Sequence, residues 1–473
     1  MSLADAVATM SAAGASVSAA ELSDWMLSQR WFAGKASELG EVAVIDAVTM
    51  PGEGDPLLIA IVEIRSPAGT HDLYQVPLGI SCEGERDGAE AGLEVAAHDG
   101  VVIYDALGDD RQVKRLTGLI ATQASVSNGA TTIAFDHPAG ASLPQEPRVR
   151  RFAGEQSNSS VVVDERHILK AFRRLEAGLN PELEMLTFLD EHGFEHIAPV
   201  DGWYQYSGEL LETTLGVMQR FVPNARDGWE LVQEALNRGA EQELLAPLAD
   251  LGAVTGEMHT VLASEPENPE FAPETPSDEH VALLTATIDE QIERMFVTMP
   301  EREALQPIRG RSEELRDRLS MLSHTAVGGR LVRCHGDYHL GQALLGPDGW
   351  IVLDFEGEPN RPLRERRRKR SPLRDVAGML RSLSYAAVAG ELLHGTPAAS
   401  VGWEAQARAS FLSGYMAEID QALLPAGAQA IEKQLAMFEL EKILYELRYE
   451  LDNRPDWLVV PVSGITRLLE HAS

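Results

Sequence analysis

The stretch from Arg333 to Pro359 reads RCHGDYHLGQALLGPDGWIVLDFEGEP, and it decides the fold that we expect for the whole chain. Within it, two short apolar runs flank a Gly-Pro-Asp-Gly sequence, which suits a tight reversal of the chain. We therefore predict a hairpin over residues 344–355. Asp337 lies in a His-Gly-Asp turn before the hairpin, Gln342 follows five residues later, and Asp354 ends the second strand.

These polar residues suit phosphoryl transfer. An amide and a carboxylate on one hairpin offer oxygen ligands, and Mg²⁺ typically takes one or two carboxylates together with the phosphates of a substrate. Moving a phosphoryl group from Mg-ATP to a hydroxyl depends mainly on positioning and on metal binding. We expect Asp337 to face the acceptor hydroxyl, and Gln342 and Asp354 to hold magnesium. The alternative is that both aspartates are ordinary turn residues.

The pattern resembles the catalytic and metal-binding loops of the aminoglycoside phosphotransferase and protein kinase-like superfamily, in which Asn usually stands at the place of Gln342. A narrower resemblance is to the actinobacterial maltokinase family, which makes maltose 1-phosphate from maltose and ATP. It covers nearly the whole chain. It rests on HGDYHLGQ, DFEGEP, RPLRERRRKRSPLRDVAGMLRS, the C-terminal YELRYELDNRPDWLVVPVSGITRL, and the upstream stretches GEQSNSSVVVDERHILKAFRRLEAGLNPELE and SQRWFAGK.

This resemblance implies an ATP site in the upstream half of the chain. Lys170, in the apolar run HILKAFRR, corresponds to the strand lysine that contacts the ATP phosphates. Glu184, in NPELE at the start of a helix, corresponds to its ion-pair partner; Glu182 competes for that role, and the resemblance favours Glu184. The sequence LGVMQRFV, which contains Met218, corresponds to the hinge strand that contacts adenine through its backbone.

A small polar loop precedes the strand of Lys170 and takes the place of a glycine-rich phosphate loop. Its backbone N–H groups and hydroxyls suit a cover over the phosphates, and a plain surface turn is the alternative. The candidate ATP-binding residues of this loop are Gln156, Ser157, Asn158 and Ser159.

The expected acceptor site lies mainly in the C-terminal segment. Sugar sites combine carboxylates and amides, which bind hydroxyls, with an aromatic ring against the apolar face of the sugar. Tyr445 and Tyr449 are about one helical turn apart, as are Glu446 and Glu450, so each pair shares a face. An ordinary amphipathic helix explains the same stripe, and the resemblance favours a site. The residues expected to bind or orient the acceptor are Tyr445, Glu446, Glu450, Arg454, Trp457, Glu356 and His335.

Length and composition predict a water-soluble enzyme of two or three domains, because 473 residues exceed the size of one usual core. A net charge of −33 repels polyanions, so we expect neither nucleic acid nor a membrane as partner. An ATP site must then be a local positive spot. Two cysteines without metal-ligand spacing, and a start without a secretory signal, favour the cytoplasm.

We predict an α+β fold of the bilobal protein kinase-like (aminoglycoside phosphotransferase-like) type with an additional β-rich N-terminal cap domain. LLIAIVEI, HDLYQVPLG and GVVIYDAL in the N-terminal part are expected strands, and ELLAPLADLGAVTGEMHTVLAS is an expected helix. The predicted domains are a cap over 1–105, an intermediate segment and kinase N-lobe over 106–221, and a mainly helical C-lobe with the catalytic loop and acceptor site over 222–473.

One segment runs against the acidic composition of the chain. Residues 361–374, RPLRERRRKRSPLR, contain eight basic residues and one acid. A solvated loop is the commonest use of such a run; a phosphate-binding patch and pairing with acidic surface elsewhere are the alternatives. A second unusual stretch, SEPENPEFAPETPSD over 264–278, carries four prolines and five acids and is expected to be an exposed loop.

Three functions compete at this stage. The resemblance implies a maltose kinase that uses ATP and Mg²⁺ and feeds α-glucan and glycogen synthesis. A second hypothesis is another small-molecule kinase on the same scaffold, such as a glucosamine kinase, and a third is a nucleotide-binding pseudokinase. The third is disfavoured because Lys170, Asp337, Gln342 and Asp354 are all present. A sugar, with maltose favoured, is the expected partner, and association with an enzyme that interconverts trehalose and maltose is left open.

Overall fold

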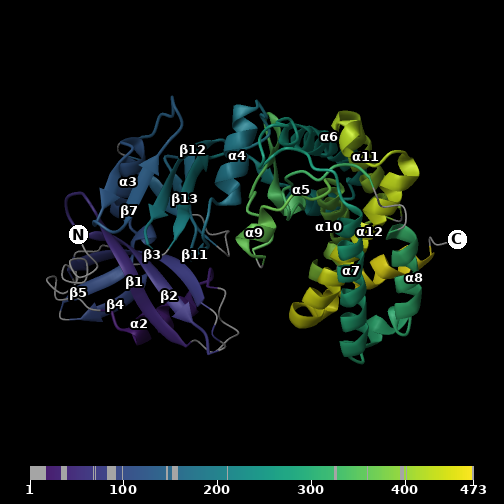
Figure 1. Cartoon of the computed structure of the whole chain (residues 1–473), viewed down its shortest axis with the longest axis horizontal. Coiled ribbons are helices and arrows are strands. Elements are labelled where there is room, and N and C mark those ends of the chain that lie inside the picture. Colours follow the sequence, from purple (N-terminus) through teal and green to yellow (C-terminus); the bar gives the residue numbers. More distant parts are fainter. Residues whose placement is uncertain are drawn as a thin grey trace. The chain divides into compact units, whose positions relative to one another are not determined.

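The structure is a computed structural model that describes residues 17–32, 40–67, 69, 71–82, 92–98, 100–144, 147–151, 158–209, 211–323, 328–359, 361–394, 399–400 and 402–470. It contains two compact units, a β-rich one over 1–187 and 198–223, and a mainly helical one over 188–197 and 224–473. The first is purple to teal in Figure 1, and the second is mostly green to yellow. The domain boundaries expected near residues 105 and 221 stay predictions.

The β-rich unit begins with an antiparallel sheet in the order β1-β2-β3-β5-β4, with β11 paired to β3. The helix α2, whose Ser18 cap accepts a hydrogen bond from the Glu21 backbone N–H, packs against β1 and β4. The elements are α2 (Ala19–Ser28), β1 (Glu41–Met50), β2 (Leu57–Arg65), β3 (His71–Cys82), β4 (Glu94–His98), β5 (Val101–Asp105) and β11 (Arg174–Leu175).

A second antiparallel sheet of the same unit has the order β6-β7-β12-β13-β10-β9-β8. Helix α3 packs against it, and α4 follows β11 in the chain. The elements are α3 (Asp110–Ala121), β6 (Ser125–Ser127), β7 (Thr132–Asp136), β8 (Val149–Arg151), β9 (Ser159–Val163), β10 (His167–Ala171), α4 (Pro181–Glu191), β12 (Val200–Ser207) and β13 (Glu212–Arg220).

Strand β2 joins two hydrophobic cores because successive side chains point to opposite faces of a strand. Leu57, Ile59 and Ile61 belong to a core shared with the seven-stranded sheet. Leu58 and Val62, which alternate with them, belong to a core with α2 on the other face. The sheet that contains β2 therefore has no solvent face along this strand, and it shares a core with the seven-stranded sheet.

Polar contacts reinforce this junction beside β10. Gln75 donates through Nε2 to the backbone oxygens of Phe172 and Leu215, at 3.0 and 2.7 Å. Arg173 pairs with Asp105, and its guanidinium lies 4.8 Å from the ring centre of Trp31. Phe172 and Arg173 follow Lys170 by two and three residues, so these contacts support the strand that carries Lys170.

The helical unit consists of helices around a small sheet in the order β14-β15-β16. Within the described residues, no helix is long and apolar enough to cross a membrane. The elements are β14 (Arg226–Asp227), α5 (Gly228–Asn237), α6 (Leu245–Leu262), α7 (Asp278–Thr298), α8 (Ser312–Ser323), β15 (Ala343–Gly346), β16 (Gly349–Val352), α9 (Leu363–Arg366), α10 (Leu373–His394), α11 (Trp403–Glu418), α12 (Ala428–Asn453) and α13 (Val459–Glu470), with short 3₁₀ turns between some of them.

Helices α6 and α11 approach closely because glycines face the partner backbone. A Cβ at Gly252 would lie 1.9 Å from the Phe411 oxygen, and one at Gly414 would lie 1.8 Å from the Ala249 oxygen. This spacing brings Tyr415 of α11 next to His259 of α6, with ring centres 5.7 Å apart.

The expected strands at 57–64, 71–79 and 100–107 and the expected helix at 243–264 are confirmed, within a few residues at their ends, as β2, β3, β5 and α6. The hairpin is also confirmed, as β15 and β16. The sequence analysis missed β1 and β4. Strand β4 is short and half exposed, and β1 carries an irregularity between Val44 and Asp46 that interrupts its alternation.

Candidate active site

The β15–β16 hairpin brings two predicted metal ligands together. Gln342 precedes β15 and Asp354 follows β16, and the Gln342 side-chain amide donates to Asp354 Oδ2 at 2.9 Å. Asp354 has a φ of +62°, a left-handed conformation that residues with a Cβ adopt mainly where surrounding structure enforces it. Because a carboxylate and an amide both offer oxygen atoms, this pair fits a hard cation such as Mg²⁺.

The turn that carries Asp337 is held from beneath by one buried carboxylate. Asp375, near the start of α10, accepts from the backbone N–H of His335 at 2.7 Å and from that of Gly336 at 3.0 Å. Gly336 has a φ of +87°, which allows the turn to present both N–H groups to one side chain.

The His335 ring joins this turn to the hairpin. Its Nε2 donates to the Leu353 carbonyl oxygen at 2.7 Å, and its Nδ1 accepts from the Asp337 backbone N–H at 3.3 Å. These two partners assign the neutral tautomer with the proton on Nε2. The ring therefore fixes Asp337 relative to the strand end that carries Asp354.

Asp375 is itself part of a buried network. His259 Nε2 donates to Asp375 Oδ2 at 3.1 Å, and the Tyr415 hydroxyl lies 3.2 Å from His259 Nδ1. Burial alone would raise the pKa of Asp375, but hydrogen bonding and charge from His259, with the backbone donors, outweigh it and lower the pKa. The turn thus rests on an ionised carboxylate within the helical core.

Asp337 faces a lysine of α12. Lys442 Nζ of α12 lies 3.4 Å from Asp337 Oδ1 and 3.5 Å from Glu358 Oε1. Burial opposes the charge of Lys442, but Asp337 and Glu358 outweigh it and raise the pKa of Lys442. For Glu358, burial likewise opposes ionisation, and Lys442 and Arg361 outweigh it and lower the pKa.

A cavity of about 50 Å³ adjoins the turn on this side. Its walls combine carboxylates, cations and aromatic rings, all within the helical unit. Arg361 pairs with Glu358, and Arg374 Nη2 donates to Glu441 Oε1 at 2.8 Å. Its main polar and aromatic lining residues are Glu358, Arg361, Arg374, Glu441, Lys442 and Tyr445.

The sequence did not indicate that Glu358, Arg361 and Arg374 belong to this lining. Arg361 and Arg374 lie in the basic run, and Glu358 follows the hairpin, so no regular spacing connects them to α12. For α12 itself a signal existed, because Glu441, Lys442 and Tyr445 share one helical face at three- and four-residue intervals.

The predicted acceptor residues divide into two groups. Tyr445 lines the cavity, and its ring lies 5.3 Å from Lys442 Nζ. Glu356 precedes the lining residue Glu358, and its backbone oxygen accepts from Arg366 at 3.2 Å.

The second group lies inside the helical unit and does not line that cavity. Glu446 binds Arg381 of α10 at 2.7 Å, and Glu450 accepts from Tyr385 at 3.1 Å. Arg454 also donates to Glu450, at 2.7 Å, and its guanidinium lies 5.0 Å from the ring centre of Trp457. These residues stabilise the packing of α12 on α10.

In the β-rich unit, the structure corrects the preferred partner of Lys170. Lys170 Nζ lies 2.6 Å from Glu182 Oε2, and Glu182 Oε1 accepts from Gln219 Nε2 at 2.7 Å. Glu182, not Glu184, therefore takes the expected partner position. Residues two apart on a helix point about 200° away from each other, and here the face of Glu182 is buried while Glu184 is part-exposed.

The remaining ATP-site candidates lie around the same sheet. Ser159 begins β9, and its hydroxyl accepts from Arg173 Nε at 2.8 Å, while the neighbouring Asn158 is buried. Met218 lies in β13 between β10 and β12 with its side chain fully buried. Gln156 and Ser157 lie outside the described residues.

Cys334 precedes the turn without taking part in its chemistry. It is buried, burial raises the pKa of its thiol, and Sγ lies 3.5 Å from the Val332 oxygen. Ligand atoms of His259, Cys334 and Asp375 lie within 4.8 Å of one another. The hydrogen bonds of His259 and Asp375 account for this cluster without a metal ion.

The fold and the hairpin site define a kinase that transfers a phosphate to a hydroxyl acceptor, and two family matches agree. Residues 148–357 match the phosphotransferase enzyme family, and residues 25–109 match the maltokinase N-terminal cap domain. The chain therefore has a maltokinase-like architecture, a maltokinase-type cap followed by a phosphotransferase domain, as the sequence resemblance predicted.

The similar proteins found by sequence and by structure are glucosamine kinases. A glucosamine kinase from Streptacidiphilus jiangxiensis is 28% identical over 328 residues, covering 67% of this chain and 72% of the relative. One from Mycolicibacterium smegmatis (strain ATCC 700084 / mc(2)155) is 26% identical over 328 residues, covering 67% and 79%. The solved structure of a glucosamine kinase with glucosamine, ADP and inorganic phosphate has a TM-score of 0.67 at 23% identity, covering 91% of this chain and 94% of that one. This structural likeness confirms the predicted fold.

The substitution Asp375→Asn is expected to destabilise the protein by about 2–3 kcal/mol at pH 7, because hydrogen bonds to an ionised group are lost. The folded-state pKa of Asp375 is lowered below an unfolded value of about 3.9. The carboxylate therefore stabilises the fold above about pH 4, and this contribution disappears as the pH falls through the folded-state pKa. Urea unfolding of both proteins between pH 7 and pH 3.5 measures the difference.

The exposed Asp452→Asn on α12 is the matched control, and it should change stability by less than about 0.5 kcal/mol. An Asp375→Asn protein as stable as the parent at pH 7 would show that the buried carboxylate does not hold the turn.

Proposed function

We propose that the protein is an ATP-dependent sugar kinase that phosphorylates maltose to maltose 1-phosphate, a product that feeds α-glucan and glycogen synthesis. The observation that carries the proposal is the placement of Asp337, with Lys442 at 3.4 Å, beside a cavity lined by charged groups and Tyr445. Carboxylates and guanidinium groups bind sugar hydroxyls, and the tyrosine ring suits the apolar face of a sugar. The maltokinase-type cap supports maltose as that sugar.

In the proposed mechanism, Asp337 accepts a hydrogen bond from the attacking hydroxyl and takes its proton as the phosphoryl group is transferred. Lys442, 3.4 Å from Asp337 Oδ1, holds this carboxylate in place. The backbone of the turn does not need to move, because Asp375 and His335 already hold it. Glu358, Glu441 and Tyr445 then orient the sugar.

The nucleotide side of the proposal uses the β-rich unit. Lys170, held by Glu182, would bind the ATP phosphates, with Asn158 and Ser159 at the start of the preceding strand. Met218 marks the strand from which the adenine contact is proposed. Gln342 and Asp354 would hold magnesium, which neutralises charge on the phosphates during transfer.

Charge balance in the cavity favours a neutral sugar. The carboxylates of Asp337, Glu358 and Glu441 form ion pairs with Lys442, Arg361 or Arg374. The fourth carboxylate here, of Asp375, accepts hydrogen bonds from His259 and from the turn. An amine would have to compete with these cations for each carboxylate. Glucosamine is nevertheless the second candidate, because the sequence relatives are glucosamine kinases.

The experiment that tests the acceptor is ATP consumption with magnesium against maltose, glucose, glucosamine, trehalose and an aminoglycoside, followed by identification of the product. Maltose-dependent turnover that yields an acid-labile anomeric phosphate is expected. Selective turnover of glucosamine would show that glucosamine, not maltose, is the acceptor, and the assignment of the kinase site would stand. No ATP consumption with any of these acceptors would contradict the proposed function.

Substitution Asp337→Asn should lower kcat by about 10²–10⁴-fold, since the amide cannot accept the proton. ATP affinity, measured by calorimetry, and the melting temperature should stay near those of the parent. Asp348→Asn, at the exposed hairpin turn, is the control and should retain full turnover. Normal turnover of Asp337→Asn would remove this residue from the catalytic role.

Two neighbouring glutamates allow a direct test of the nucleotide site. Glu182→Gln should lower kcat/KM for ATP by about tenfold or more, because Lys170 loses a buried charged partner. Glu184→Gln, two residues away on the part-exposed face of α4, should stay close to the parent. Steady-state kinetics with varied ATP decides between them, and a larger loss in Glu184→Gln would restore the original assignment.

A further inference from the structure

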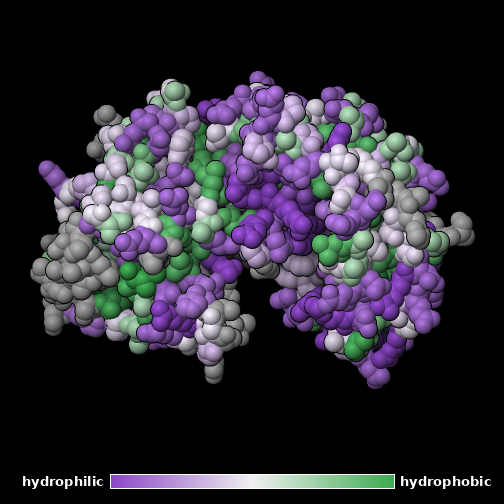
Figure 2. All heavy atoms as spheres, in the orientation of Figure 1, coloured by the Kyte–Doolittle hydropathy of each residue, from purple (hydrophilic) through white to green (hydrophobic). Residues whose placement is uncertain are grey.

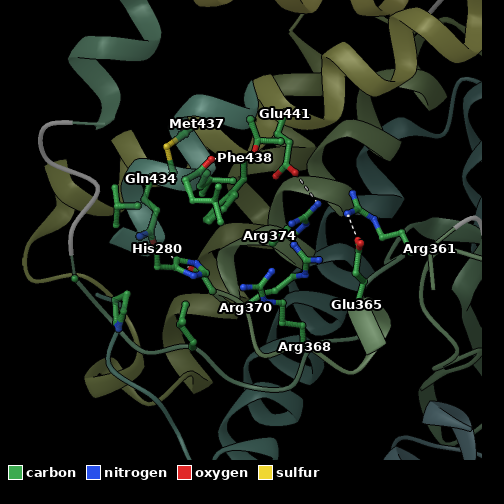
Figure 3. A pocket seen from close by; sticks show the side chains of 18 residues that line it. His280, Arg361, Glu365, Arg368, Arg370, Arg374, Gln434, Met437, Phe438 and Glu441 are labelled. Atoms are coloured by element: carbon green, nitrogen blue, oxygen red, sulfur yellow. Dashed lines mark hydrogen bonds and ion pairs between the residues drawn. The ribbon is translucent and has the colours of Figure 1, made fainter. Parts of the chain in front are cut away.

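A second, larger cavity lies next to the one beside Asp337, within the helical unit. It has a volume of about 280 Å³ and is formed by α7, α12 and the basic segment 361–374 (Figure 3). Figure 3 shows four guanidinium groups gathered on one side, from Arg361, Arg368, Arg370 and Arg374. Figure 2 shows hydrophilic side chains over the region of α9, which belongs to the same basic segment.

Part of the basic segment is neutralised by the acidic loop expected at 264–278. Lys369 Nζ lies 2.8 Å from Glu274 Oε1, and Arg367 Nη2 lies 3.0 Å from Glu270 Oε2. The alternative of pairing with acidic surface elsewhere in the chain is therefore confirmed for these two residues. This pairing also fixes the backbone from which the intervening Arg368 projects.

The cations that face the cavity are less well compensated. Arg374 pairs with Glu441, and Arg361 with Glu358 and Glu365. Across the part of the chain that the structure describes, the guanidinium groups of Arg368 and Arg370 show no hydrogen bond or ion pair. The cavity lining includes four arginines but two carboxylates, of Glu365 and Glu441, in a protein whose net charge is −33.

Electrostatic repulsion around Arg370 favours the binding of an anion. Burial, followed by repulsion from Arg374 and Arg361, lowers the pKa of Arg370 to about 10. The pKa of the His280 imidazole, which lines the same cavity, is lowered by burial and by Arg368 and Arg370. A bound anion would relieve this repulsion, and a phosphate offers oxygens that several guanidinium groups can share.

Part of the cavity wall is apolar and suits an organic body rather than a bare ion. Leu331, Met437 and Phe438 belong to this part of the lining. A volume of about 280 Å³ is close to the lower limit of about 300 Å³ for small-molecule sites. A ring of sugar size could lie against Phe438 while its phosphate reaches the arginines.

We propose that this cavity binds a phosphorylated small molecule of the size of a sugar monophosphate, with its phosphate held by Arg368 and Arg370. Arg361, Arg374 and Glu441 line both this cavity and the one beside Asp337. An occupied pocket would therefore change the charge balance next to the proposed acceptor site. The binding claim does not depend on which sugar is the acceptor, so the two proposals can fail separately.

The test is isothermal titration calorimetry of the full chain without nucleotide, with glucose 6-phosphate as the probe. Inorganic phosphate and glucose are titrated in parallel. We expect glucose 6-phosphate to bind more tightly than inorganic phosphate, and glucose to give no signal. The double variant R368Q/R370Q should weaken glucose 6-phosphate binding at least tenfold, and higher salt should weaken it further in the parent.

Arg364→Gln is the matched control, because Arg364 is an exposed arginine of the same segment that does not line the cavity. It should bind the probe like the parent. If the double variant does not fold, as judged by its melting curve, the exposed Arg368→Gln alone replaces it, with an expected weakening of about threefold or more.

Three results would overturn the proposal. They are no binding of glucose 6-phosphate to the parent, equal binding by parent and double variant, and an equal loss in Arg364→Gln. Inorganic phosphate that binds as tightly as glucose 6-phosphate would also overturn it, since the apolar wall would then contribute nothing.

Discussion

The candidate active site of the helical unit depends on one buried carboxylate. Asp375 accepts two backbone N–H groups of the turn that presents Asp337, and it receives a third hydrogen bond from His259. A charge can stay inside a protein only when such donors replace the water it has lost. Because α6, α10 and the turn all contribute to this one arrangement, the position of Asp337 is set by the packing of helices and not by the turn alone.

The same principle of held charges extends to the groups around Asp337. Lys442 lies between Asp337 and Glu358, and Arg374 binds Glu441 on the far wall of the cavity. Each side chain is fixed by a partner on another element, so little ordering remains to be done when a sugar enters. Such preorganisation is the main means by which a protein can assist phosphoryl transfer.

The sequence was sufficient to predict features whose signals are local. The hairpin, with its turn residues and alternating apolar runs, placed Gln342 and Asp354 together, and the structure joins them by a hydrogen bond. Features that depend on tertiary packing were not predictable in this way. Asp375 lies 40 residues from His335, whose backbone N–H it binds. The local sequence LRDVAGML at the start of a helix does not predict that contact.

The choice between Glu182 and Glu184 required knowing which face of α4 is buried, and motif spacing alone does not supply that information. The stripe on α12 posed a similar problem. Its aromatic and acidic residues do lie on one helix, but they have different uses. Glu446 and Glu450 contact α10, while Glu441 and Lys442 line the cavity. Lys442, Glu446 and Glu450 follow one another at four-residue intervals, so neighbouring residues along one helix serve the candidate site and the packing, and composition cannot separate them.

The shared core of β2 has a consequence for how this architecture can change in evolution. Alternate residues of that strand are buried on both faces, and one set packs directly against the strands around β10. A shortened gene that lacked the first hundred codons would leave an uncovered apolar sheet, prone to self-association. The cap can therefore be lost only if the seven-stranded sheet acquires a new polar surface at the same time. We expect the two segments to be inherited together.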